Sequence, residues 1–272
     1  MDNPNIHQNL ENTSNNATND NSIFIPNGQT INVSATIGWI GDAWDFITPK
    51  LVMWIVMVII YGIIQLGLIL IPHFGFILPN LLEPLFVAGI IVICEKQRTH
   101  GKFELGRFFD GFKYKCGDLL VVGLIVCGIQ IISSLLIALI DGDNLYQSVF
   151  GDIYSYINFD SIITYNDSES SFLSLMISLI SLFLSTACSW FAPALIILKN
   201  FNVGKALSIS FNAISKNILG VILFFIFMYL LIFLSTLPLF LGLLLTAPLY
   251  MATSYSSYRR VFYKKEESSN KL

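Results

Sequence analysis

From residue 51 onward, the chain alternates long apolar runs with short polar connections. A bilayer core about 30 Å thick requires about 20 apolar residues of α-helix, and six runs have that length. The predicted spans are Leu51–Ile71, Phe76–Cys94, Leu119–Ile140, Phe172–Leu198, Asn217–Thr236 and Leu239–Ser257. The pattern therefore predicts an all-α integral membrane protein with six transmembrane helices.

A short amphipathic stretch precedes each odd-numbered span, and such stretches are typical of helices that lie in the headgroup layer. The apolar positions are Ile40, Trp44 and Ile47 before the first span, Leu105, Phe108, Phe109 and Phe112 before the third, and Val203, Leu207, Phe211 and Ile214 before the fifth. Each even-numbered span also carries a proline: Pro84, Pro193 and Pro248. The pattern indicates a threefold repeat of parallel units, although any hairpin of membrane helices can have an amphipathic start and a proline.

The composition excludes an ordinary soluble fold. Hydrophobic residues make up 54% of the chain and charged residues only 12%, whereas about a quarter of a typical soluble chain is charged. The net charge of −3 provides no basic surface for nucleic acid. Neither the four cysteines (Cys94, Cys116, Cys127 and Cys188) nor the three scattered histidines have the spacing of a metal site or a disulfide framework. We therefore expect no metal and no cofactor.

The distribution of basic residues predicts the orientation. Lys and Arg are enriched on the cytoplasmic side of membrane proteins, and the connection 141–171 contains none but carries six acids. We therefore expect this acidic loop outside and both termini in the cytoplasm, in the cell inner membrane. The predicted organisation is a disordered asparagine-rich tail over 1–36, a transmembrane domain over 37–258 and a basic tail over 259–272.

Glu83 is the carboxylate that lies well inside an apolar run, roughly 10 Å into the second span at a rise of about 1.5 Å per residue. A charge there is costly, so such residues usually face a cavity or a partner. With the amides Asn80, Gln65 and Gln130, it predicts an intramembrane site for a small solute or a proton. The alternative is that Glu83 is neutral and hydrogen-bonded to a neighbouring helix.

Two further sets of residues are candidates for packing and lipid contact. Ser174, Ser178, Ser181 and Ser185 recur at helical spacing and predict a seam where two helices approach closely, with a hydrated path as the alternative. Lys113, Lys115, Arg259 and Arg260 lie among aromatic residues and predict contact with anionic lipid at the cytoplasmic face.

Several motifs together resemble a family of bacterial integral membrane proteins, the "BPSS-type" hypothetical membrane proteins. They are residues 37–46 (IGWIGDAWDF), 71–75 (IPHFG), 84–89 (PLFVAG), 105–112 (LGRFFDGF), 206–210 (ALSIS) and 255–259 (YSSYR). The resemblance covers roughly residues 35–263. It implies a bacterial inner-membrane location and a six-helix core, and because the family is uncharacterised it implies no activity.

Two functions remain open from the sequence. The first is a permease-like protein for a small solute or lipid, with its polar core around Glu83. The second is a non-transporting scaffold or partner subunit that binds lipid, other membrane proteins or a second copy of itself. We expect no enzyme, because the chain contains no HExxH, GxSxG or P-loop motif.

Overall fold

The computed structural model describes residues 22–75, 77–141, 172–239 and 241–265, of which 83% are helical. Residues 142–171 of the predicted acidic loop and the first 21 residues lie outside the described residues. The elements are β1 (Ser22–Phe24), α2 (Val33–Ile47), η1 (Thr48–Lys50), α3 (Leu51–Ile69), α4 (Ile77–His100), η2 (Leu105–Phe109), α5 (Asp110–Lys113), α6 (Cys116–Asp141), α10 (Phe172–Ser189), α11 (Ala192–Lys199), α12 (Val203–Lys216), α13 (Ile218–Thr236), α14 (Leu243–Phe262) and β2 (Tyr263–Lys265).

Five helical segments are long and apolar enough to cross a membrane. They are Ala35–Ile69, Ile77–His100, Cys116–Asp141, Phe172–Lys199 and Ile218–Thr236. The sixth predicted span is also a helix, α14, but it begins four residues later than predicted and extends through Arg259 and Arg260. Its second half is rich in serine and tyrosine and is buried against protein. The structure therefore confirms a helical protein compatible with a membrane, and the count of six spans stays a prediction.

The predicted fourth span is divided into two helices. α10 ends at Ser189, the chain bends at Trp190 and Phe191, and α11 begins at Ala192 with Pro193 in its first turn. Proline fits the first turn of a helix because its missing N–H has no intrahelical acceptor there. The buried hydroxyl of Ser210, on α12, accepts a hydrogen bond from the Phe191 N–H at 3.2 Å and donates one to the Ala187 carbonyl at 2.7 Å. The neighbouring helix thus satisfies two backbone groups at the bend.

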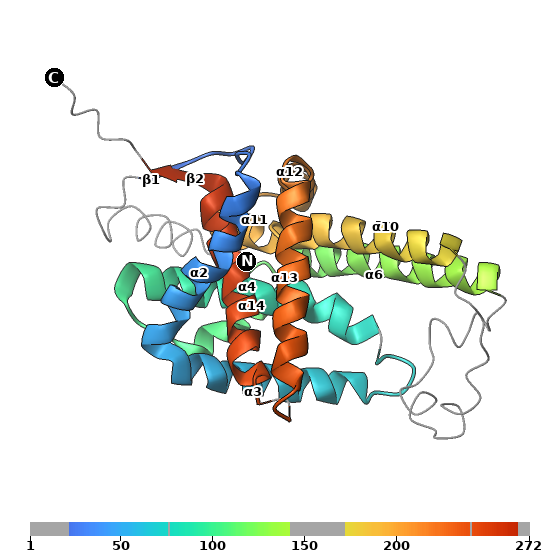
Figure 1. The fold of residues 1–272 in the computed structure, drawn as a ribbon, viewed down its shortest axis with the longest axis horizontal. Helices are drawn as coiled ribbons and strands as arrows, with labels where there is room; N and C mark the ends of the chain where they lie inside the picture. The colour runs from blue at the N-terminus through green and yellow to red at the C-terminus, as the bar shows by residue number, and fades with distance from the viewer. Residues whose placement is uncertain (1–21, 76, 142–171, 240, 266–272) are drawn as a thin grey trace.

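The three amphipathic stretches form helices at the predicted places, and all three pack against protein. In chain order, the three hairpins consist of α3 with α4, α6 with α10 and α11, and α13 with α14. η2 and α5 pack on α4, α12 packs on α10 and α11, and α2 packs on α14. η2 with α5, and likewise α12, therefore cover the second half of the hairpin that precedes them in the chain. α2 covers the second helix of the last hairpin, α14. In Figure 1 α13 and α14 run vertically whereas α6 and α10 run horizontally, so the hairpins point in different directions.

The two ends of the described residues pair in a small two-stranded sheet. β1 pairs with β2 in antiparallel register, with Ile23 opposite Lys264. The Gln29 side chain donates to the Arg260 carbonyl at 2.8 Å, and the Asn217 side chain accepts from the Ile31 N–H at 2.7 Å. Residues 22–36, which we predicted to be part of a disordered tail, therefore form β1, a hydrogen-bonded connection and the start of α2.

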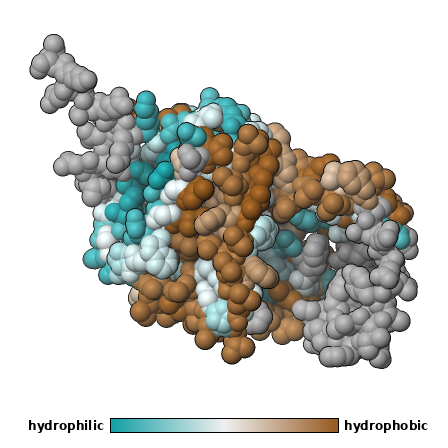
Figure 2. Space-filling model, viewed as in Figure 1, coloured by the Kyte–Doolittle hydropathy of each residue, from teal (hydrophilic) through white to brown (hydrophobic). Residues whose placement is uncertain are grey.

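The outer surface is strongly apolar. Figure 2 shows brown side chains over α13 and along the pair of α6 and α10, whereas hydrophilic residues gather near the two strands. On α13, the exposed residues include Leu219, Ile226 and Phe233, each more than 60% accessible. Exposed apolar area of this extent indicates contact with lipid or another apolar partner.

Candidate functional site: a polar cavity between the hairpins

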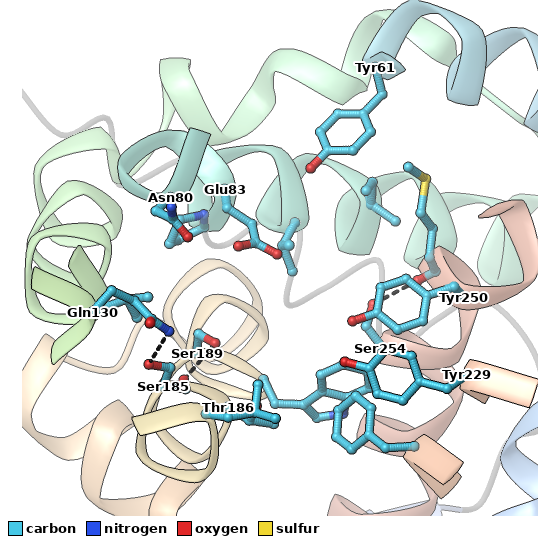
Figure 3. Close-up of a pocket in the computed structure, with 18 residues that line it drawn as sticks. Tyr61, Asn80, Glu83, Gln130, Ser185, Thr186, Ser189, Tyr229, Tyr250 and Ser254 are labelled. Atoms are coloured by element: carbon cyan, nitrogen blue, oxygen red, sulfur yellow. Dashed lines mark hydrogen bonds between the residues drawn. The ribbon is translucent and has the colours of Figure 1, made fainter. Parts of the chain in front are cut away.

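A cavity of about 300 Å³ lies between the three hairpins. Its walls come from α3, α4, α6, α10, α13 and α14, together with Trp190 from the bend before α11. Its polar lining residues, shown in Figure 3, are Tyr61, Asn80, Glu83, Gln130, Ser185, Thr186, Ser189, Tyr229, Tyr250 and Ser254. Polar groups from every hairpin therefore gather in one place within otherwise apolar helices.

Glu83 is the acidic group of the cavity. Its side chain is accessible, whereas Pro84, Leu85 and Phe86, the next three residues of α4, are buried. Figure 3 shows the carboxylate pointing into the cavity. Among the described residues, no hydrogen bond or ion pair to this carboxylate is found. Asn80 lines the same wall one turn earlier on α4.

Gln130 and the end of α10 form the facing wall. The Gln130 amide donates to the Ser185 hydroxyl at 3.0 Å, and the Ser189 hydroxyl donates to the Ser185 carbonyl at 2.8 Å. The first bond joins α6 to α10 at the edge of the cavity, and the second lies within α10 (Figure 3). The structure thus brings together three of the four polar residues predicted as one cluster. The fourth, Gln65, lies on α3 one turn beyond Tyr61 and is not among the residues that line the cavity.

The predicted serine seam follows the contact between α6 and α10. Ser174, Ser181 and Ser185 are buried, and the Ser174 hydroxyl donates to Asp141 at 2.8 Å. Ser178 is exposed and bonds only its own helix, at the Ser174 carbonyl. The seam therefore packs two helices along most of its length and reaches the cavity at Ser185.

Three tyrosines complete the cavity, and our sequence analysis did not identify them. Tyr61 comes from α3, Tyr229 from α13 and Tyr250 from α14. Figure 3 shows their hydroxyl groups directed toward the cavity. Their place inside long apolar runs was an available signal, because a tyrosine hydroxyl within an apolar helix usually finds a polar partner.

Aromatic rings form the wall on the side of α13 and α14. The Trp190 ring lies 5.4 Å from that of Phe225 and 5.9 Å from that of Tyr250, measured between centroids. The Trp190 indole N–H donates to the Ser257 hydroxyl at 3.0 Å. This bond fixes the ring at the bend between α10 and α11, so the wall has a defined shape.

A second pocket, of about 460 Å³, lies nearer the strands and contains two of the four predicted basic residues. Arg260 forms a two-pronged ion pair with Asp42, and this hydrogen bonding raises the pKa of Arg260. Arg98 also lines the pocket; it donates to Glu95 at 2.6 Å and to the Tyr255 hydroxyl at 2.9 Å.

The remaining predicted basic residues lie elsewhere. Lys113 is exposed, with its ammonium 5.0 Å from the centre of the Tyr114 ring. Lys115 lies 3.8 Å from the Asp118 carboxylate. The four basic residues therefore do not form one site.

Comparisons with known proteins identify no relative. No family model matches the chain, and no curated protein and no solved structure matches it. The resemblance to the BPSS-type family therefore stays a prediction from its motifs. Within the described ranges, no group of three or more His, Cys, Asp and Glu side chains is placed to hold a metal ion.

Proposed function

We propose that the protein is a permease-like protein of the cell inner membrane that accepts a small solute in the cavity around Glu83. The observation that carries the proposal is an accessible carboxylate, without a hydrogen-bonding partner among the described residues, in a cavity lined by all three hairpins. Substrate sites of membrane transporters are commonly formed where repeated units meet. A purely structural glutamate would instead be expected to bond a neighbouring helix.

The proposed architecture is six spans in three repeated units, with both termini in the cytoplasm. Because the hairpins point in different directions in Figure 1, this architecture requires them to align with one another in the bilayer. The cyclic packing of α2, of η2 with α5, and of α12 on the preceding hairpins supports the repeat. The pairing of β1 with β2 supports placing both termini on one side, because the two strands are adjacent. In this arrangement α14 is the sixth span, with Arg259 and Arg260 at its cytoplasmic end.

The experiment is solute permeation into proteoliposomes, measured by stopped-flow light scattering with glycerol, urea and butylammonium chloride as probes. Ser189→Trp fills the cavity, and Leu230→Trp places the same indole side chain on the exposed face of α13. We expect at least one probe to enter faster than into protein-free liposomes, and this excess to be lost in Ser189→Trp and kept in Leu230→Trp. Equal rates with and without protein for all three probes would contradict a permease and favour the scaffold.

A further inference from the structure

The charged groups of the cavity have one sign. Glu83 is its acid, and no Lys, Arg or His is found among the described residues that line it. Two arginines line the second pocket instead, and there Arg260 is paired with Asp42 and Arg98 with Glu95. An anionic ligand would therefore meet an uncompensated carboxylate, whereas a cation would supply the missing opposite charge.

The surroundings of Glu83 provide acceptors for N–H donors. Figure 3 shows the hydroxyl oxygens of Tyr61, Tyr229 and Tyr250 directed into the cavity, and the Gln130 side chain lines the facing wall. An ammonium group carries N–H donors and no acceptor. These oxygens can share the N–H groups that Glu83 does not bind.

The opposite wall favours a cation that carries carbon. Trp190 and Phe225 pack with Tyr250 into an aromatic surface. Aromatic rings attract organic cations and also bury alkyl groups. Hard metal ions instead require several oxygen ligands, commonly including more than one carboxylate, and the lining of this cavity supplies one.

The cavity limits the size of the ligand. A volume of about 300 Å³ corresponds to about ten water-sized groups at roughly 30 Å³ each. From the charge, the acceptors, the aromatic wall and the size, we infer that the cavity binds a small monovalent organic ammonium ion, with its nitrogen at Glu83 and its carbon groups against Trp190 and Phe225. This inference rests on the proposed function and names its substrate class.

The experiment is isothermal titration calorimetry of the full chain in detergent, with butylammonium chloride as the probe. Butyramide serves as the neutral ligand of similar size, and sodium chloride as the inorganic cation. We expect butylammonium to bind at least about tenfold more tightly than either comparator, because truncating one partner of a close charge pair typically costs at least that much affinity.

Variants locate the binding. We expect Glu83→Gln to lose about tenfold or more of the butylammonium affinity, and Trp190→Leu to weaken it. Glu104→Gln, which removes an acid outside the cavity, should leave the affinity unchanged. Because the comparison with butyramide uses the wild-type chain, it decides the question even if a variant fails to fold.

Equal binding of butylammonium and butyramide, or no detectable butylammonium binding, would overturn the inference. Unchanged affinity in Glu83→Gln would also overturn it. If glycerol or urea permeates through the cavity and butylammonium does not bind, the inference fails and the proposed function stands. If no probe binds or permeates, both fail.

Discussion

Replacing Gly89 with alanine tests the packing of η2 on α4. A Cβ at Gly89 would collide with the backbone carbonyl of Phe108, and one at Gly111 would collide with the carbonyl of Leu85 on the same interface. Phe108 is fully buried, and its ring stacks on Phe86 with centroids 5.2 Å apart. Because backbone cannot rotate away, the two elements must separate and this aromatic contact must loosen.

The expected effect of Gly89→Ala is a loss of about 1–3 kcal/mol in the free energy of unfolding, the usual cost of overpacking a buried contact. This corresponds to about a 5- to 160-fold change in the unfolding equilibrium. The assay is reversible unfolding of the detergent-solubilised chain. Gly62→Ala on α3 is the matched control, because a Cβ there meets nothing within 4 Å. Equal stability of Gly89→Ala and Gly62→Ala would refute the close approach.

The same unfolding assay tests three polar contacts. Ser210→Ala should cost about 1–3 kcal/mol, because it leaves two backbone groups at the bend before α11 without their partner; a neutral result would mean that water or another group replaces the hydroxyl. Gln97→Leu should cost a similar 1–3 kcal/mol, roughly, because the buried amide bonds the Trp54 indole and a carbonyl of α2, and unchanged stability would argue against this bridge. Asp42→Asn should cost less than about 1 kcal/mol and less at high salt, because the pair with Arg260 is 42% and 37% exposed; a larger, salt-independent loss would show that the pair is shielded from solvent.

Part of the cavity could be predicted from the sequence because polar groups in apolar helices usually face other protein. Asn80 and Glu83 lie three residues apart and therefore on one face of α4. Gln65 was predicted to join them because it is also a polar residue in an apolar span, but it does not line the cavity. The direction in which a polar residue of a long apolar helix points depends on how that helix rotates against its neighbours, and the local sequence of α3 does not determine this.

Helical periodicity also explains which of the four predicted seam serines is exposed. At about 100° per residue, Ser181 and Ser185 lie within about 20° of Ser174, whereas Ser178 lies about 40° away and about 60° from Ser181. Ser178 is therefore at the edge of the stripe, and it is the serine that is exposed.

Contacts between residues far apart in the sequence account for the two places where the observed fold differs from the predicted one. Pro84 and Pro248 lie inside continuous helices, yet the helix containing Pro193 is interrupted, where Ser210 of α12 supplies a partner for the backbone. Likewise, β1 is stabilised by residues about 240 positions later. Neither the break nor the strand has a local signal strong enough to be predicted.

The central claim is that water reaches Glu83 inside the protein, between helices that cross the membrane. The direct measurement is labelling of Glu83→Cys by a membrane-impermeant thiol reagent in sealed vesicles, in a background where the four native cysteines are replaced. Leu230→Cys, on the exposed apolar face of α13, is the control for a position in lipid. We predict rapid labelling of Glu83→Cys from one side and none of Leu230→Cys. If Glu83→Cys is not labelled from either side, the cavity is closed to water and the proposed solute site is wrong.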